Sequence, residues 1–153
     1  APLMAHAEGW QWTPDMIWFN NLESYGTPNY YVQKLYSTNK GTDLISVTQN
    51  GEDLVGQDEL YASATLDSEA KEVVLKVVNT SSEAQEIQLN FKGKSIKNKG
   101  KVIVLKEENL TQENSFDAQE AISPSTEEIK VKGDSASYEV APYSLNIIRI
   151  PVK

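Results

Sequence analysis

The residues best placed to do chemistry in this sequence are two acids near its start, Glu8 and Asp15, which flank a pair of tryptophans. Glycoside hydrolysis needs two carboxyl groups about 5–9.5 Å apart in a shielded site. Asp15, however, follows Thr-Pro and is better explained as the cap of a turn. Glu8 has only its neighbours Gly9 and Trp10 to suggest that it faces a ligand. We therefore predict no catalytic residue in this chain.

The tryptophans between these acids, Trp10 and Trp12, are the candidate substrate-binding residues. Flat aromatic rings can stack on the apolar faces of sugars, and a Gly-containing loop would leave them accessible. The alternative is that the rings belong to an apolar core, and for these two residues both interpretations stay open. For four other aromatic residues we favour the core: Trp18, Phe19, Tyr31 and Tyr36.

Other reaction classes lack the residues they need. His6 is the only histidine and there is no cysteine. A Ser-His-Asp triad would have to use His6, but no G-x-S-x-G turn accompanies it, so we expect this histidine to be structural. One histidine is too few for a transition-metal site, and neither a Walker loop nor a G-x-G-x-x-G motif is present. We predict neither a metal site nor a cofactor.

The charge of the chain limits its partners. The formal net charge of -8 repels phosphate backbones and anionic lipids, so we expect neither a nucleic-acid nor a membrane partner. A neutral ligand or another protein fits better. Much of the charge lies in residues 106–128, where seven carboxylates stand against Lys106 alone. Because these acids lack the alternating spacing of an EF-hand loop, we interpret the segment as a solvated loop.

The aromatic residues are concentrated at the start of the chain, where eight of the thirteen lie within the first 36 residues. The same stretch holds few charges, so the composition changes near residue 40. One strand and one helix cannot bury so many large side chains, and an exposed patch of this kind usually marks a missing partner. That partner could be another part of a longer protein or, through the exposed aromatic residues, a second copy of the chain.

Three elements are predicted in this first region. Residues 2–7 are typical of the end of a buried strand. The Thr-Pro-Asp sequence after the tryptophans opens a turn or one helical turn that carries residues 16–19. Thr27 and Pro28 are typical of an N-cap followed by the first helical position. We therefore predict a helix from Pro28 to about Asn39.

The rest of the chain is dominated by alternation of apolar and polar residues. Residues 86–92 and 127–133 alternate as half-buried antiparallel strands do. The runs Val73–Val78 and Val102–Leu105 are apolar on both faces, which predicts central strands covered on two sides. Three further strands are predicted: Leu44–Thr48, Tyr61–Leu66 and Tyr138–Val152. Seven or eight strands of this spacing favour a mainly β fold, an antiparallel β-sandwich of jelly-roll or immunoglobulin-like form.

Longer motifs carry a family resemblance. APLMAHAEGWQWTPDMIWFNN and SYGTPNYYVQKLYSTNKG resemble the end of the catalytic barrel in family 51 α-L-arabinofuranosidases. There, an APLFAH-type strand leads to a W-x-W-T-P-D-L-I-W-F-D-N loop and then to an S-Y-G-T-P-x-Y-Y-V-Q helix. Downstream, LYASATLD, VVLKVVNTS, ENSFDAQEAISP and APYSLNIIRI are similar to the C-terminal β-sandwich of that family.

The resemblance implies two parts. Residues 1–42 would be a strand-loop-helix remnant of a (β/α)8 barrel, its last βα unit, and residues 43–153 a jelly-roll-like C-terminal sandwich. The implied parent removes terminal α-L-arabinofuranosyl groups from arabinoxylan or arabinan with retention of configuration. Its two catalytic glutamates lie on strands before the eighth, so neither has a counterpart here. We expect an accessory domain that is inactive on its own.

The resemblance also implies partners and a place for the candidate residues. The partners would be the remainder of the barrel in cis and an arabinose-containing polysaccharide or oligosaccharide, with an extracellular or periplasmic location favoured. The eighth βα loop of a barrel lies near the rim of its active site, which supports Trp10 and Trp12. Asn20 stands where the family usually has Asp, and HAEGW replaces H-x-D-A-W. We therefore assign no substrate contact to Glu8 or Asn20.

Two other functions remain open. The chain could be a carbohydrate-binding module of a polysaccharide-degrading enzyme, although the strands from Leu44 onward hold few aromatic residues. It could also be an adhesion or structural sandwich, which rests on analogy of fold alone.

Overall fold

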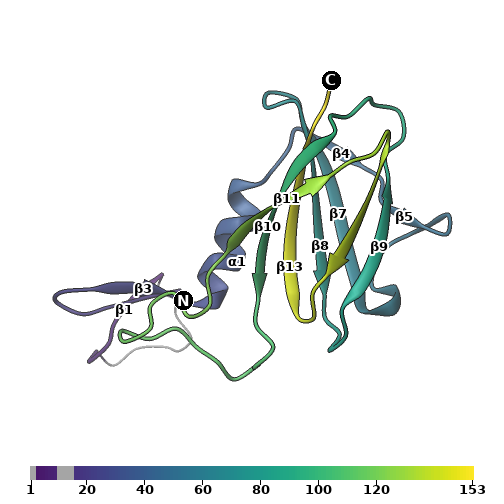
Figure 1. Cartoon of the computed structure of the whole chain (residues 1–153). Coiled ribbons are helices and arrows are strands. Elements are labelled where there is room, and N and C mark those ends of the chain that lie inside the picture. The colour runs from purple at the N-terminus through teal and green to yellow at the C-terminus, as the bar shows by residue number, and fades with distance from the viewer. Residues whose placement is uncertain (1–2, 10–15) are drawn as a thin grey trace.

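A six-stranded antiparallel sheet forms the centre of the computed structural model, which describes residues 3–9 and 16–153 (Figure 1). Its second and fourth strands, in the order given next, cover the predicted apolar runs Val102–Leu105 and Val73–Val78, so both predictions of inner strands are confirmed. The strands lie in the order β11 (Ser125–Lys130), β10 (Lys99–Lys106), β13 (Ser144–Pro151), β8 (Glu72–Asn79), β7 (Leu60–Asp67) and β4 (Asp43–Ile45).

A smaller layer covers one face of this sheet and makes the structure a β-sandwich. β9 (Gln85–Asn90) pairs with β12 (Ser135–Val140), and its residues alternate between half-buried and exposed, as predicted. The short hairpin of β5 (Thr48–Gln49) and β6 (Glu52–Asp53) precedes the 3-10 helix η1 (Gln57–Glu59). The core between the layers is built mainly from aliphatic side chains, including Leu75, Val77, Val102, Ile129, Val140, Ile148 and Ile150. The prediction of a mainly β, antiparallel sandwich is confirmed.

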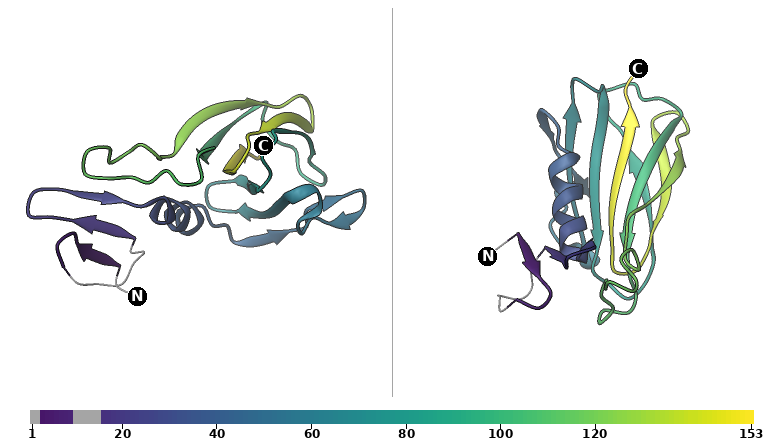
Figure 2. Two further views of the ribbon diagram at one scale, coloured as in Figure 1. Left: turned by 90° about the horizontal axis from the view of Figure 1, so that it is seen from below. Right: turned by 90° about the vertical axis from the view of Figure 1, so that its left-hand side faces the viewer.

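The one α-helix among the described residues, α1 (Pro28–Thr38), covers the opposite face of the large sheet (Figure 2). The Thr27 side chain accepts a hydrogen bond from the Tyr30 N–H and caps the helix, so the predicted start is confirmed. Leu35 of the helix packs with buried residues of three central strands: Val74, Leu105, Leu145 and Ile147. The central strands therefore have an apolar core on each face.

An ion-pair network fixes the end of α1 to this face. Arg149 Nε donates to Glu72 Oε2 at 2.6 Å and Nη2 donates to Asp67 Oδ2 at 3.2 Å. Arg149 Nη1 donates to the Oδ1 of Asn39 at 3.1 Å. Asn39 is buried at the helix C-cap, and its Nδ2 donates to the Leu35 carbonyl. The guanidinium of β13 thus joins the helix end to two neighbouring strands.

The first region forms a small sheet that projects from the sandwich (Figure 1). β1 (Met4–His6) pairs in parallel with β2 (Ile17–Phe19), which pairs antiparallel with β3 (Ser24–Gly26). The predicted turn or helical turn over residues 16–19 is therefore wrong. Ile, Trp and Phe favour extended backbone, and Asn20 Oδ1 accepts the N–H groups of Leu22 and Glu23, which closes the turn after the strand.

One predicted strand is divided in two. Residues 138–152 do not continue as one strand, because Pro142 lacks an N–H and Tyr143 has a left-handed φ of 43°. The first half becomes β12 in the small layer and the second half becomes β13 in the large sheet. The chain crosses from one layer of the sandwich to the other at this turn.

Candidate functional site

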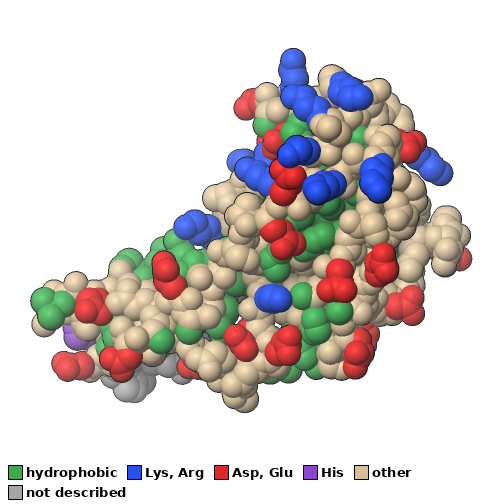
Figure 3. All heavy atoms as spheres, viewed as in Figure 1, with side chains coloured by type: hydrophobic (Ala, Val, Ile, Leu, Met, Phe, Trp, Pro, Cys, Tyr) green, Lys and Arg blue, Asp and Glu red, His purple; other side chains and the backbone are tan. Residues whose placement is uncertain are grey.

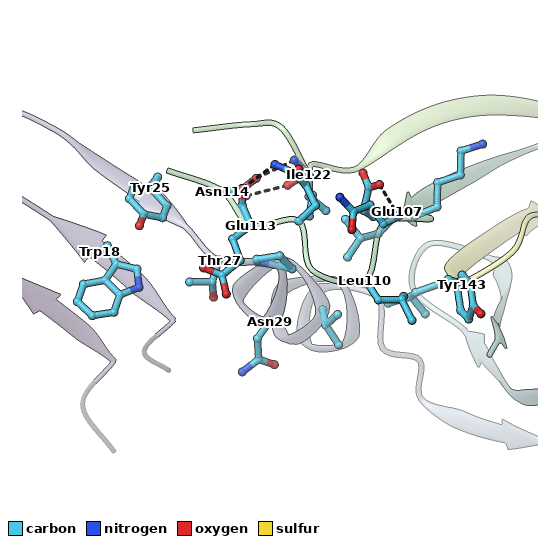
Figure 4. Close-up of a pocket in the computed structure, with 17 residues that line it drawn as sticks. Trp18, Tyr25, Thr27, Asn29, Glu107, Leu110, Glu113, Asn114, Ile122 and Tyr143 are labelled. Atoms are coloured by element: carbon cyan, nitrogen blue, oxygen red, sulfur yellow. Dashed lines mark hydrogen bonds between the residues drawn. The ribbon is translucent and has the colours of Figure 1, made fainter. Parts of the chain in front are cut away.

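A groove of about 520 Å³ opens where the small N-terminal sheet, the start of α1 and residues 105–114 meet (Figure 4). Its floor includes apolar side chains of the core under α1, such as Val32, Leu105 and Leu145. Its walls carry aromatic, amide and carboxylate groups: Trp18, Tyr25, Asn29, Asn109, Gln112 and Glu113. The combination of an apolar floor and a polar rim is typical of small-ligand sites.

The aromatic wall comes from the hairpin of β2 and β3. Trp18 and Tyr25 are opposite each other in the ladder, so both side chains lie on the same face of the hairpin. Tyr25 packs edge to face against Phe116, with ring centroids 4.9 Å apart. Burial raises the pKa of the Tyr25 hydroxyl, and the nearby Glu113 carboxylate raises it further. A tyrosine hydroxyl is protonated near neutral pH even at its ordinary pKa, so Tyr25 can act as a hydrogen-bond donor, and the raised pKa extends this to more alkaline pH.

The hairpin is held by a loop that lies far away in the sequence. Asn114 is buried, and its Nδ2 donates to the carbonyls of Gly26 and Ile122, at 2.9 Å each. Its Oδ1 accepts the Ile122 N–H at 2.7 Å. Gln119 Nε2 adds a second tether, a 2.6 Å hydrogen bond to Glu23 Oε2. We refer to residues 113–122 as the clasp.

The clasp corrects the interpretation of residues 106–128 as a solvated loop. The carboxylates are exposed or half-buried, as expected, but Asn114 and Ile122 are buried. Ile122 packs into the core under α1. The segment also ends in β11, an edge strand that contains Glu127 and Glu128. Acidic composition predicted the exposed side chains, but it concealed the two residues that fix the loop.

The predicted site residues have different outcomes. Trp10, Trp12 and Asp15 lie outside the described residues. Glu8 is exposed, and its N–H donates to Nδ1 of His6 at 3.2 Å. The His6 ring packs edge to face on Phe19, with centroids 5.3 Å apart, which agrees with a structural histidine.

The four aromatic residues that were assigned to the core also differ in where the structure places them. Tyr31 packs against the core under α1, as predicted. Trp18 and Phe19 are half-buried, and Trp18 lines the groove. Tyr36 is 41% exposed, so its core assignment is wrong. Its ring lies beneath Lys76, with Nζ 5.2 Å from the centroid, a cation–π contact at the edge of the helix.

Sequence reasoning missed the residues that build the groove. Tyr25 was not singled out, although its position opposite Trp18 follows once β2 and β3 are known. Asn114 contacts Gly26 across 88 residues of sequence, and no spacing pattern reveals such a contact. A signal does exist in Asn-Ser-Phe, an uncharged interruption of the acidic segment.

The charge around the groove is mainly negative. Glu107 and Glu113 line it with Lys106, and the Glu107 carboxylate accepts the N–H of Asn109 at 2.8 Å. In the view of Figure 3 acidic side chains lie over the lower part of the molecule, whereas most of the basic side chains gather near the C-terminal end. Within residues 3–9 and 16–153, no three His, Asp or Glu side chains are grouped to hold a metal ion. No helix of this described part is long and apolar enough to cross a membrane.

The known proteins that this chain resembles in sequence are α-L-arabinofuranosidases. The α-L-arabinofuranosidase 1 of Arabidopsis thaliana is 28% identical over 152 residues, which cover 95% of this chain and 22% of that protein. The probable α-L-arabinofuranosidase A of Aspergillus flavus is 29% identical over 150 residues, 97% of this chain and again 22% of the relative. The chain thus spans about a fifth of the length of these relatives.

Solved structures agree with the sequence relatives. An arabinose-bound GH51 α-L-arabinofuranosidase has a TM-score of 0.86 and 27% identity, covering 100% of this chain and 24% of that one. The Thermotoga maritima α-L-arabinofuranosidase in complex with arabinose shares the fold, with a TM-score of 0.72 at 18% identity over 88% of this chain and 31% of that one. The family model of the α-L-arabinofuranosidase C-terminal domain matches residues 1–144. The chain belongs to this family, the C-terminal domain of the GH51 α-L-arabinofuranosidases.

Proposed function

We propose that this chain acts as the non-catalytic C-terminal accessory domain of an enzyme that removes terminal α-L-arabinofuranosyl residues from arabinoxylan or arabinan, with retention of configuration. The observation that carries the proposal is the family match, which runs from residue 1 to residue 144 while the relatives are several times longer. Retaining hydrolysis needs a nucleophile and an acid/base, and both would come from the barrel of the whole protein.

We also propose that residues 1–42 complete the catalytic barrel in cis and that residues 43–153 form the accessory sandwich. In the projecting sheet, Leu3, Met4 and Leu22 are 58%, 48% and 91% exposed. Figure 3 shows apolar side chains on this projecting end. Large apolar side chains left in water favour a covering partner. A barrel in cis is the partner, and self-association through this patch would compete with it.

The first test compares the chain with an assembled enzyme. The purified chain should not hydrolyse an aryl α-L-arabinofuranoside. When it replaces the C-terminal region of the arabinose-bound GH51 enzyme that it resembles, the chimera should be active, and the truncated barrel alone should not. Specific turnover by the pure chain would contradict a non-catalytic role. A truncated barrel as active as the chimera would contradict the accessory role.

Trp10 and Trp12 remain our proposed substrate contacts in that assembled enzyme. Their family motif belongs to the eighth βα loop, and such loops surround the active site of a barrel. Trp10→Ala and Trp12→Ala should each raise KM of the chimera for an arabino-oligosaccharide. Tyr61→Ala, which removes an exposed aromatic ring of β7, is the matched control and should leave KM unchanged. Unchanged KM in both tryptophan variants would remove them as contacts.

A further inference from the structure

The groove beside α1 has the composition of a saccharide site. Trp18 and Tyr25 present adjacent rings on one face of the hairpin, and Tyr143 lines the groove with them. Aromatic rings offer a large apolar surface at a low cost in conformational entropy, and they match the C–H faces of sugar rings. Figure 4 shows Trp18 and Tyr25 side by side at one end of the groove.

The polar groups of the rim suit hydroxyl groups. Asn29, Asn109 and Gln112 provide exposed amide side chains, which can both donate and accept. Glu113 is exposed beside Tyr25 and can accept hydrogen bonds from two neighbouring hydroxyls. Asn114 does not take part, because Gly26 and Ile122 already occupy its amide group. It frames the site instead of binding in it.

Charge narrows the choice of ligand. Two carboxylates, Glu107 and Glu113, line the groove against one lysine, Lys106, and this excess of negative charge disfavours phosphates, uronic acids and other anions. An apolar protein partner, such as the apolar face of a helix, fits less well, because it would remove water from these carboxylates without offering them hydrogen-bond partners. The volume of about 520 Å³ lies within the range of small-ligand sites. A neutral, polyhydroxylated ligand of one to three sugar rings satisfies all of these conditions.

We infer that this groove binds neutral arabinofuranosyl oligosaccharide, as a saccharide site additional to the reaction centre. The choice of sugar rests on the proposed function, since the groove alone specifies only a neutral saccharide. The site would hold a branch or the next stretch of the polysaccharide while another residue is hydrolysed in the barrel. The clasp gives it a fixed shape, because Asn114 and Phe116 hold the hairpin that carries the aromatic wall.

The test is a titration of the full chain with arabinotriose, followed by backbone amide NMR. Signals from residues 17–29 and 105–114 should move in a saturable way, and those of β9 and β12 should not. Trp18→Ala should weaken the affinity roughly tenfold, as expected for the loss of an aromatic contact of about 1.4 kcal/mol. Glu113→Ala should lower the affinity for arabinotriose several-fold. Because this side chain is exposed, such a loss of affinity would not reflect unfolding. Tyr61→Ala is the aromatic control outside the groove and should bind normally.

Two ligand controls complete the experiment. Cellotriose should bind more weakly than arabinotriose, and trigalacturonate should not move the groove signals because of its charge. Absence of saturable shifts with arabinotriose, or equal binding by wild type, Trp18→Ala and Glu113→Ala, would overturn the inference. The inference would also be overturned if arabinotriose no longer shifted the groove signals in the chimera, since the barrel would then cover the groove. An active chimera that does not bind saccharide in the groove would contradict the groove inference and leave the proposed function intact. Groove binding in an inactive chimera would support the groove inference and contradict the proposed function.

Discussion

The sandwich and the small N-terminal sheet are stabilised in different ways. In the sandwich, strands of up to eight residues pair along their whole length, and Ile147 and Ile150 of β13 are fully buried on opposite faces. In the N-terminal sheet the strands have three residues each. Among the described residues before α1, only Ala5 is buried. One region carries its own core, and the other depends on contacts with its surroundings.

The boundary between the two regions in the sequence is therefore not the boundary between them in packing. α1 continues directly from the N-terminal sheet, yet Leu35 packs on the large sheet of the sandwich. Asn114, from the sandwich half, is bonded to Gly26 of the hairpin. The helix and the clasp together attach a weakly cored sheet to a strongly cored one. Changes in the two regions should therefore have effects of very different size.

The largest effect is expected in the central core. Ile148→Ala removes three carbon atoms from a side chain that is 1% exposed, and it should lower the free energy of unfolding by about 2–5 kcal/mol through lost burial and a residual cavity. Urea denaturation followed by circular dichroism measures this change. Leu44→Ala, at an edge-strand position that is 90% exposed, is the control and should stay within about 0.5 kcal/mol.

The next largest effect tests the dependence of the hairpin on the clasp. Asn114→Ala leaves two carbonyls and one N–H without the buried amide that bonds them, which costs about 1–3 kcal/mol. Hydrogen exchange should accelerate in β2 and β3 and remain slow in β8 and β13. Gln112→Ala, a neighbouring exposed residue, should change neither region. Equal acceleration in both sheets would show that the two regions unfold as one unit.

Local patterns predicted the strongly cored region well. Alternation over residues 86–92 became β9, and the apolar runs of β8 and β10 became inner strands. Thr27 and Pro28 gave the start of α1, because capping depends on residues close in sequence. In each case the signal lies in residues that are adjacent in the sequence: two residues for the start of the helix and four to seven for the strands.

Local patterns failed where structure depends on distant contacts. Ile17–Phe19 is too short to show a period, and its pairing with β1 and β3 decides its conformation. The groove could not be predicted, since Asn114 reaches Gly26 from far along the chain. Residue type alone assigned Trp18 to the core, whereas the ladder places it beside Tyr25 on the groove wall.

A moderate effect is expected where α1 meets the sandwich. Arg149→Met removes a guanidinium that is 11% exposed from two carboxylates that are 19% and 21% exposed. Because water reaches those carboxylates, the loss should be about 1–3 kcal/mol, below that for a fully buried pair. Thermal unfolding with matched buffers measures it. Lys99→Met breaks an ion pair whose members are 62% and 49% exposed, and its effect should be under about 1 kcal/mol.

A smaller effect concerns pH at the same contact. The N–H of Ala70 and then Arg149 hold the pKa of Asp67 below its ordinary value, against the opposing effect of burial. A lowered pKa in the folded state stabilises the fold above the unfolded-state pKa, and this contribution is lost as the pH falls through the folded value. Asp67→Asn should therefore be less stable than wild type at pH 7, and the gap should close well below pH about 4.

The control for this pH dependence is Asp134→Asn, an exposed aspartate of the loop before β12. Its stability should follow wild type across the same pH series, measured by urea unfolding at each pH. A gap between wild type and Asp67→Asn that persists undiminished at pH 2 would mean that the carboxylate charge does not contribute and that shape alone matters.

The smallest effect on stability separates folding from association. Leu22→Ser replaces a side chain that is 91% exposed, so the free energy of unfolding should stay within about 0.5 kcal/mol. In the chimera, however, the same change should lower the thermal stability of the whole enzyme, because the barrel would bury this position. Val55→Ser, on the sandwich and 72% exposed, should be neutral in both backgrounds. If Leu22→Ser destabilised the isolated chain as strongly as Asn114→Ala, the N-terminal sheet would have a core of its own, and the contrast between the two regions would fail.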